Sequence, residues 1–206
     1  MKVPNILTLS RFGFTLIMMV LLSVDLPFAK SGALLVFAIG GITDFFDGYL
    51  ARNVYGISSF GKLMDPLADK VMVSAAFICF VQIRLESYPD SPLVPAFLVV
   101  LIIAREFMVT GLRLLAAGKG KVISAGKWGK HKTVWQIVAI VLILLGLAIR
   151  DDILPRILDM QSQAVKDFDF AFHVMALVVT IAVSLITVIS GAKYFYEHHE
   201  LIMRNA

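Results

Sequence analysis

Long apolar segments are the feature that most limits what this chain can fold into. A helix that crosses a bilayer needs about 20 mostly apolar residues. Six segments of the 206-residue sequence approach this requirement, namely 6–24, 31–50, 63–83, 93–117, 134–149 with some extension at each end, and about 170–192. The connections between them are short. The sequence therefore predicts an all-α polytopic membrane protein with six transmembrane helices, forming a single domain over residues 1–206.

The composition agrees with this fold class and excludes others. Hydrophobic residues make up 59% of the chain and charged residues 17%, whereas soluble domains carry about 25% charged residues. A disordered chain would be poor in apolar residues, and the single cysteine, Cys79, excludes a disulfide scaffold within the chain. The net charge of +4 is explained by basic loops at a membrane surface, so we expect no nucleic-acid partner.

The basic residues of the loops predict an orientation in the membrane, because cytoplasmic loops carry an excess of Lys and Arg. Six spans place both termini on one side. That side would carry eleven Lys and Arg residues and the opposite side five. The opposite loops also contain acidic residues, among them Asp152 and Asp169. We therefore expect both termini and the 51–62 and 118–133 loops to be cytoplasmic.

Four aspartates lie where an apolar membrane segment would not be expected to carry charge. Asp44 and Asp47 lie near the end of the second segment, and Asp65 and Asp69 near the start of the third. Each pair shares one face of its helix, and the short connection makes the two helices antiparallel neighbours. Four carboxylates at one depth would repel one another strongly. All-oxygen ligands favour Mg²⁺, Mn²⁺ or Ca²⁺ over Zn²⁺, so we expect a divalent metal site.

Helix capping is the alternative explanation for these acids. A carboxylate is stabilised at a helix N-terminus, which suits Asp65. It does not suit Asp44 and Asp47, because the dipole near a helix C-terminus disfavours negative charge.

The acids form part of a longer motif. Written in full, the motif is Asp44-x2-Asp47-Gly48-x2-Ala51-Arg52-x8-Gly61-x3-Asp65-x3-Asp69. It resembles the signature of the CDP-alcohol phosphatidyltransferase family at all eight fixed positions. The resemblance implies a six-helix membrane enzyme, usually a homodimer, with a polar cavity facing the cytoplasm. Such enzymes displace CMP from a CDP-linked lipid with an alcohol and hold two metal ions, Mg²⁺ or Mn²⁺, among the four aspartates.

Further segments resemble the bacterial branch of the family that makes phosphatidylglycerophosphate. These segments are 3–11, 103–107, 110–113, 129–133 and 190–196. This resemblance implies that CDP-diacylglycerol and sn-glycerol 3-phosphate react to give phosphatidylglycerophosphate and CMP. It also implies contact with membrane lipids, in a bacterial cytoplasmic membrane with the active site on the cytoplasmic side.

The resemblance assigns roles to individual motif residues. Asp44, Asp47 and Asp65 match the metal ligands, while Asp69 matches the general base and also a metal ligand. The positions that line the cytidine pocket and bind the diphosphate are matched by Gly48, Ala51, Gly61 and Arg52. Asn5 and Thr8 would reach the nucleotide, although capping of the first helix explains them equally well.

A second group of cations indicates the kind of alcohol. Arg105 and Arg113 are eight residues apart, a little over two helical turns, and so share one face. Lys130 and Lys132 begin the fifth segment. Such a cluster favours an anionic acceptor, and Glu106 would pair with one of the cations. The alternative for the lysines is the basic loop pattern itself or contact with anionic lipid.

Two other functions remain open from the sequence. A sister enzyme of the same chemistry could use inositol phosphate, serine or, as a cardiolipin synthase, phosphatidylglycerol. A divalent-cation channel or carrier lined by the aspartates belongs to another class. The two halves of the chain show no convincing repeat, whereas inverted repeats are common in transporters.

Overall fold

The computed structural model describes residues 3–50, 59–118 and 127–197, and describes side chains within 9–43, 70–114, 116 and 132–197. The helices are α1 (Val3–Ser23), α2 (Ala29–Leu50), α3 (Ser59–Gln82), α4 (Ala96–Gly118), α5 (Lys127–Leu147), the π-helix η2 (Ala148–Ile153), the 3₁₀-helix η3 (Leu154–Arg156) and α6 (Gln163–Glu197). An isolated bridge between Leu85 and Tyr88 is the one β-type pairing among the described residues. The predicted all-α class is therefore confirmed.

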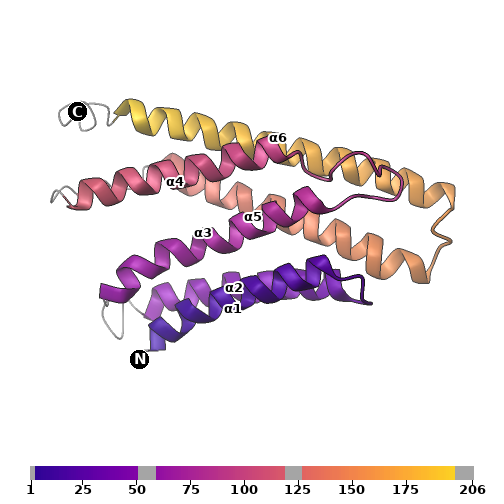
Figure 1. Cartoon of the computed structure of the whole chain (residues 1–206), viewed down its shortest axis with the longest axis horizontal. Helices are drawn as coiled ribbons and strands as arrows, with labels where there is room; N and C mark the ends of the chain where they lie inside the picture. The colour runs from indigo at the N-terminus through magenta and orange to yellow at the C-terminus, as the bar shows by residue number, and fades with distance from the viewer. Residues whose placement is uncertain (1–2, 51–58, 119–126, 198–206) are drawn as a thin grey trace.

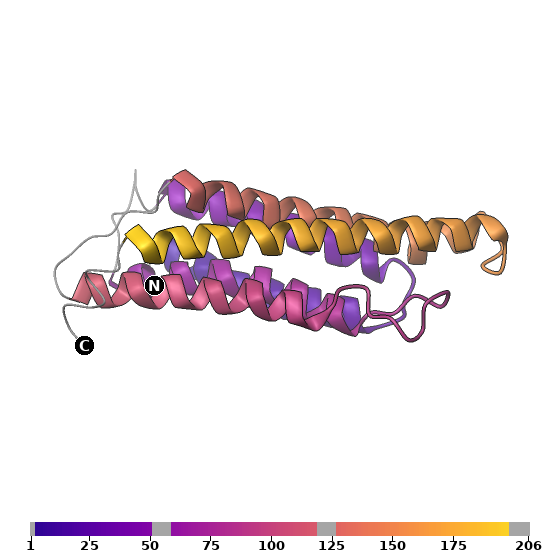
Figure 2. The same cartoon turned by 90° about the horizontal axis from the view of Figure 1, so that it is seen from above.

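The six long helices run broadly along one direction and form an elongated bundle (Figures 1 and 2). Helix α1 packs against α2 and α3, while α6 packs against α4 and α5. Helix α1 begins and helix α6 ends at the same end of the bundle, here called the terminal end (Figure 1). The connections 24–28, 83–95 and 148–162 lie at the opposite, far end.

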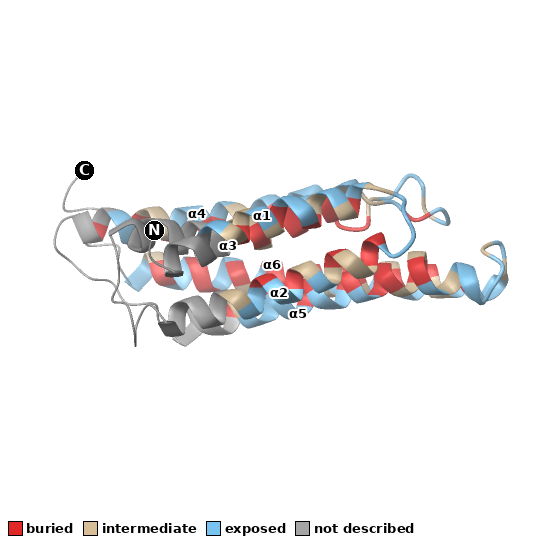
Figure 3. Ribbon diagram, turned by 90° about the horizontal axis from the view of Figure 1, so that it is seen from below, coloured by how far each residue is buried: buried red, intermediate tan, exposed pale blue. Residues whose placement is uncertain are grey.

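Apolar side chains lie both inside and outside this bundle. The core contains fully buried residues such as Met18, Phe77 and Ile140. Large apolar side chains are also exposed on the outside, including Leu16 and Phe97. Figure 3 shows buried and exposed positions alternating along each helix. Helices that are apolar on every face are typical of a deeply buried or lipid-embedded environment.

Within the described residues, one helix, α6 (Gln163–Glu197), is long and apolar enough to cross a membrane by length and composition. Three further stretches, Leu9–Ser23, Ala29–Thr43 and Lys70–Gln82, are the apolar parts of α1, α2 and α3 whose side chains the structure describes. Each of the six expected segments coincides with a helix, but six transmembrane spans remain a prediction. Helix α6 begins earlier than the expected 170, because Gln163–Phe170 continues the helix with a more polar sequence.

Buried polar groups join the elements at the far end. The Asp152 carboxylate accepts hydrogen bonds from the backbone N–H and the hydroxyl of Ser31, both at 2.6 Å. Asp169 accepts bonds from Arg150 Nε at 3.2 Å and from Ser87 Oγ at 2.7 Å. Both carboxylates are buried, although the sequence suggested loop charges. They are satisfied because each meets donors from a distant part of the chain, as buried polar groups require.

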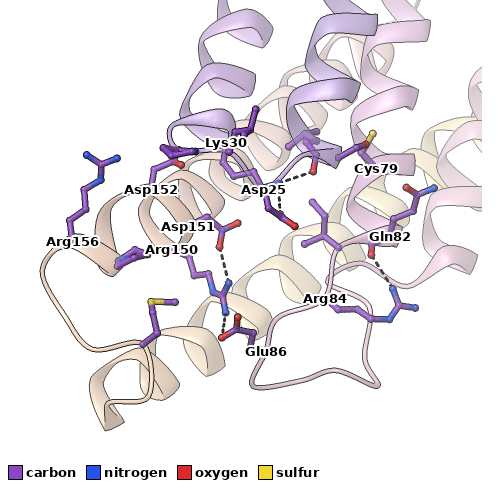
Figure 4. Close-up of a pocket in the computed structure, with 17 residues that line it drawn as sticks. Asp25, Lys30, Cys79, Gln82, Arg84, Glu86, Arg150, Asp151, Asp152 and Arg156 are labelled. Carbon is purple, nitrogen blue, oxygen red and sulfur yellow. Dashed lines mark hydrogen bonds and ion pairs between the residues drawn. The ribbon is translucent and has the colours of Figure 1, made fainter.

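A cavity of about 780 Å³ lies beside this network. Its charged lining has both signs, as Figure 4 shows for Asp25, Lys30, Arg150, Asp151 and Asp152 among others. Several of these groups are already bonded within the protein. Lys30 Nζ donates to the carbonyl oxygens of Leu22 at 2.8 Å and Val24 at 3.0 Å, where α1 ends. The polar residues around this cavity thus tie helix termini together.

Candidate functional site

The backbone brings the two halves of the aspartate motif to the terminal end. Helix α2 carries Asp44, Asp47 and Gly48 in its last turns, and α3 carries Gly61, Asp65 and Asp69 in its first turns. Helix α2 ends and α3 begins at the terminal end, and α1 packs against both (Figure 1). Asn5 and Thr8 lie at the start of α1. The motif halves therefore share one end of the bundle, as expected from their spacing.

The side-chain geometry of the motif lies outside the described part of the chain. Ala51 and Arg52 fall wholly outside the described residues, and Lys130 and the other motif positions are described by their backbone alone. No group of three or more His, Cys, Asp or Glu side chains lies close together among the side chains that are described. The metal and nucleotide contacts of the motif remain predictions.

A buried ionic cluster lies between α3, α4 and α5, and its centre is Glu106. The Glu106 carboxylate is 5% exposed. One of its oxygens accepts a hydrogen bond from Lys70 Nζ at 2.7 Å. The other accepts from Lys132 Nζ, from Arg105 Nη1 at 3.3 Å and, more distantly, from the Gln136 amide at 3.4 Å. Three cations thus meet one carboxylate in a region largely shielded from water.

Arg105 is fixed from the other side by α6. Its side chain is 7% exposed, and its Nη2 donates to the Ser190 hydroxyl at 2.8 Å. The next residue, Gly191, leaves room for the arginine, since a Cβ there would lie 2.7 Å from Arg105 Cγ. Guanidinium has five N–H donors in a planar fork. The donations to Glu106 and Ser190 leave further donors on Arg105.

Arg113 lies on the same helix but in a different environment. Its side chain is exposed. Arg105 and Arg113 both act electrostatically on Tyr194 of α6, and Tyr194 packs with Val109 and Leu112 of α4. The structure therefore joins Arg105 and Lys132 in one cluster and places Arg113 at its outer side, along the α4–α6 contact.

The sequence interpretation anticipated one member of this cluster in part and missed another. Glu106 was expected to pair with one cation, whereas it pairs with three. Lys70 was not expected at all, although it directly follows Asp69 in the motif. That adjacency was the available signal. Lys70 follows the expected general base directly in the sequence. Its ammonium group donates to Glu106, the acid at the centre of the cluster.

A cavity of about 20 Å³ adjoins the cluster and is lined by Lys70, Glu106 and Gln136, together with Val73, Ser74, Ile102 and Thr133. This volume is close to what a single water molecule requires. The cavity therefore has room for about one water molecule beside the Glu106 carboxylate.

Comparisons of the sequence with a family model and with individual proteins identify the same family. A family model described as CDP-alcohol phosphatidyltransferase matches residues 1–189. A CDP-diacylglycerol–glycerol-3-phosphate 3-phosphatidyltransferase of Bacillus subtilis (strain 168) is 37% identical, and the alignment covers 98% of this chain and 97% of that protein. Proteins with the same name from Rickettsia bellii and Pseudomonas fluorescens are 35% and 33% identical, each over 70% of this chain and over 76% and 72% of their own lengths.

Proposed function

The chain belongs to the CDP-alcohol phosphatidyltransferase family, and from that premise we propose that it transfers the phosphatidyl group of CDP-diacylglycerol to sn-glycerol 3-phosphate. The products are phosphatidylglycerophosphate and CMP. The observation that carries this proposal is the similarity to the Bacillus subtilis transferase of that name over almost the whole of both chains. The family expected from the aspartate motif is thereby confirmed.

The reaction requires a positioned hydroxyl, a base and charge stabilisation. The acceptor hydroxyl oxygen attacks the phosphatidyl phosphorus, a new P–O bond forms, and the P–O bond to CMP breaks. Phosphoryl-transfer enzymes achieve this mainly by positioning and by electrostatic stabilisation. We assign Asp69 as the base that accepts the hydroxyl proton, because it is the last acid of the motif and lies in an early turn of α3.

The four motif aspartates are suited to holding two Mg²⁺ or Mn²⁺ ions. The donor set is all-oxygen, which these hard ions prefer, and the backbone carries both pairs to the terminal end. Asp44, Asp47, Asp65 and Asp69 would be the ligands. When bound, the ions would neutralise negative charge on the diphosphate.

The nucleotide half of the donor is assigned from the motif. Gly48, Ala51 and Gly61 would line the cytidine pocket, where the absence of large side chains allows close approach. Arg52 would bind the diphosphate, which suits a planar guanidinium. Asn5 and Thr8 would contact the nucleotide from the start of α1, which lies at the terminal end with the motif.

The basic cluster supports an anionic acceptor. We propose that Arg105, Arg113, Lys130 and Lys132 bind the phosphate of glycerol 3-phosphate. Among the described side chains, Arg105, Lys132 and Lys70 meet around the carboxylate of Glu106, and such a group of buried cations is stabilised by negative charge nearby. Serine, a zwitterion, would gain little from this arrangement. Inositol phosphate and phosphatidylglycerol are anionic, so they remain the alternatives to exclude.

A lipid donor also implies a membrane location. We propose one membrane domain of six transmembrane helices over residues 1–206, in a bacterial cytoplasmic membrane, with the terminal end, both termini and the active site facing the cytoplasm. The apolar exterior of the bundle, the length of α6 and the eleven-to-five distribution of loop cations support this. Like its family, the enzyme would contact membrane lipids and act as a homodimer.

An acceptor panel tests the proposal. The purified protein, in nanodiscs with CDP-diacylglycerol and Mg²⁺, is supplied separately with labelled glycerol 3-phosphate, inositol phosphate, serine and phosphatidylglycerol. We expect CMP release and lipid labelling with glycerol 3-phosphate. Conversion of another alcohol instead would establish a sister enzyme. Metal flux in liposomes without CDP-lipid, and no transfer to any alcohol, would establish the channel or carrier.

A further inference from the structure

We propose that Glu106 is a positioning residue for acceptor binding: its carboxylate holds the ammonium groups of Lys70 and Lys132 in place, and Arg105, anchored on α6, holds the carboxylate. This inference rests on the proposed function, because it deepens the acceptor site. It addresses a feature that simple charge complementarity does not explain, namely a buried carboxylate at the centre of a site for an anion.

The geometry shows Glu106 bonded on both oxygens. Lys70 Nζ on α3 bonds to one oxygen at 2.7 Å, and Lys132 Nζ on α5 bonds to the other. Charge-assisted hydrogen bonds of this kind are short and directional. Lysine side chains are long and rotate freely in the absence of a partner, and fixing each one costs conformational entropy. Because Glu106 already orders the two lysines, less conformational entropy is lost when the acceptor binds.

Arg105 connects this carboxylate to α6. Its Nη1 donates to Glu106 at 3.3 Å and its Nη2 donates to Ser190 Oγ at 2.8 Å. The backbone at Gly191 comes so close to the Arg105 side chain that a methyl group there would overlap Arg105 Cγ. The Ser190–Gly191 step therefore fixes the guanidinium, and through it the carboxylate, from the side opposite α3.

The charge of Glu106 predicts in which direction acceptor binding should change when the carboxylate is removed. A carboxylate within a few ångströms repels a phosphate, especially where water is largely excluded. If Glu106 acted on the acceptor through its charge alone, its removal would tighten acceptor binding. If it acts by holding the cations, its removal weakens acceptor binding, because the cations lose one of the groups that orient them. The two roles thus predict opposite changes in the acceptor KM.

The test compares Glu106→Gln and Glu106→Asp with the wild-type protein in nanodiscs, varying glycerol 3-phosphate and CDP-diacylglycerol separately. We expect Glu106→Gln to raise the KM for glycerol 3-phosphate about tenfold and to change the KM for CDP-diacylglycerol less than about twofold. Glu106→Asp keeps the charge on a shorter arm, so it should recover part of the loss. A lowered acceptor KM in Glu106→Gln would overturn the inference.

A glycine pair tests the α6 anchor without altering charge. Gly191→Ala places a methyl group against Arg105, whereas at Gly13 on α1 the same methyl group would meet nothing within 4 Å. We expect Gly191→Ala to raise the acceptor KM severalfold and Gly13→Ala to leave it unchanged. Equal acceptor KM values in both variants would overturn the anchoring role.

A purely structural role for Glu106 is distinguished by a matched carboxylate elsewhere. Asp169→Asn removes a buried, ion-paired carboxylate at the far end. If Glu106→Gln behaved like Asp169→Asn, with lower thermal stability and unchanged KM values, the inference would fail while the proposed function stood. If the wild-type protein transferred nothing to glycerol 3-phosphate, the proposed acceptor itself would fail, and the inference with it.

Discussion

The bundle buries ionic groups at two places, and the two places differ in their proportion of cations to carboxylates. Around Glu106, three cations contact one carboxylate among the described side chains. At the far end, the buried carboxylates of Asp152 and Asp169 each have donors of their own, from Ser31 and from Arg150 and Ser87. Burial of charge is tolerated in both because partners are present. Several cations around one acid suit a site for an anion, whereas at the far end the one arginine, Arg150, is surrounded by the carboxylates of Asp169, Asp151 and Glu86, which suits a structural joint.

The far-end network explains how a loop-rich region is fixed. Arg150 pairs with Asp169 at 3.2 Å and with Asp151 at 2.8 Å. Burial lowers the pKa of the Arg150 guanidinium, but the hydrogen bonds to Asp151 and Asp169 raise it, and the net pKa lies above its ordinary value. A raised folded-state pKa means that the contribution of the Arg150 charge is fully present below the unfolded-state pKa of arginine and is lost as the pH rises through the folded-state pKa. Arg150 therefore stays charged throughout the physiological pH range.

The largest effect on catalysis should come from replacing the proposed base, Asp69, at the terminal end. Asp69→Asn removes the proton acceptor and should lower turnover by about 10³-fold or more, while CDP-diacylglycerol binding is largely kept. The measurement is CMP release alongside binding of labelled CDP-lipid. Near-normal turnover would remove the base assignment, and equal loss of lipid binding would indicate a ligand role instead.

Removal of divalent metal should act on the terminal end alone. Excess chelator should stop transfer, because the diphosphate charge would then be unneutralised, and added Mg²⁺ or Mn²⁺ should restore it. The thermal midpoint should fall as well, because the four motif carboxylates would then repel one another, whereas the described far-end joint uses protein groups only. Full activity in chelator would contradict the proposed metal site.

A substitution at the far end should lower the stability of the protein and leave its kinetic constants unchanged. Asp169→Asn removes the most buried of the carboxylates around Arg150, while Asp151 and Glu86 remain, and should cost about 2 kcal/mol of folding free energy. Thermal unfolding of the detergent-solubilised protein measures this. The KM values for both substrates should stay at wild-type levels in the folded fraction, and a specific rise in the acceptor KM would show that the two ends are coupled.

The smallest effect should come from the exposed arginine of the terminal end. Arg113 is exposed, so Arg113→Ala should raise the acceptor KM only about fivefold, less than the change expected for Glu106→Gln. The KM for CDP-diacylglycerol should rise less than that for the acceptor. The opposite pattern in steady-state kinetics would reassign Arg113 to the donor.

Much of this organisation could be predicted from local sequence. Apolar runs of sufficient length locate the six long helices, and the fixed spacing of the aspartate motif identifies the family. Arg105 and Lys132 could be placed in one basic group from helix periodicity and loop charge. Asp169 was misjudged as a loop charge because its burial depends on Ser87 and Arg150, which lie 82 and 19 residues away.

The sequence by itself determined the helices, the family and the end of the bundle that carries the motif, because each depends on residues close together in the chain. Only the tertiary structure decided which charges meet. Lys70 reaches Glu106 across 36 residues and Arg105 reaches Ser190 across 85. These bonds exist because α3 and α6 both pack against α4, and helix packing is set by side chains along whole faces that no short motif records.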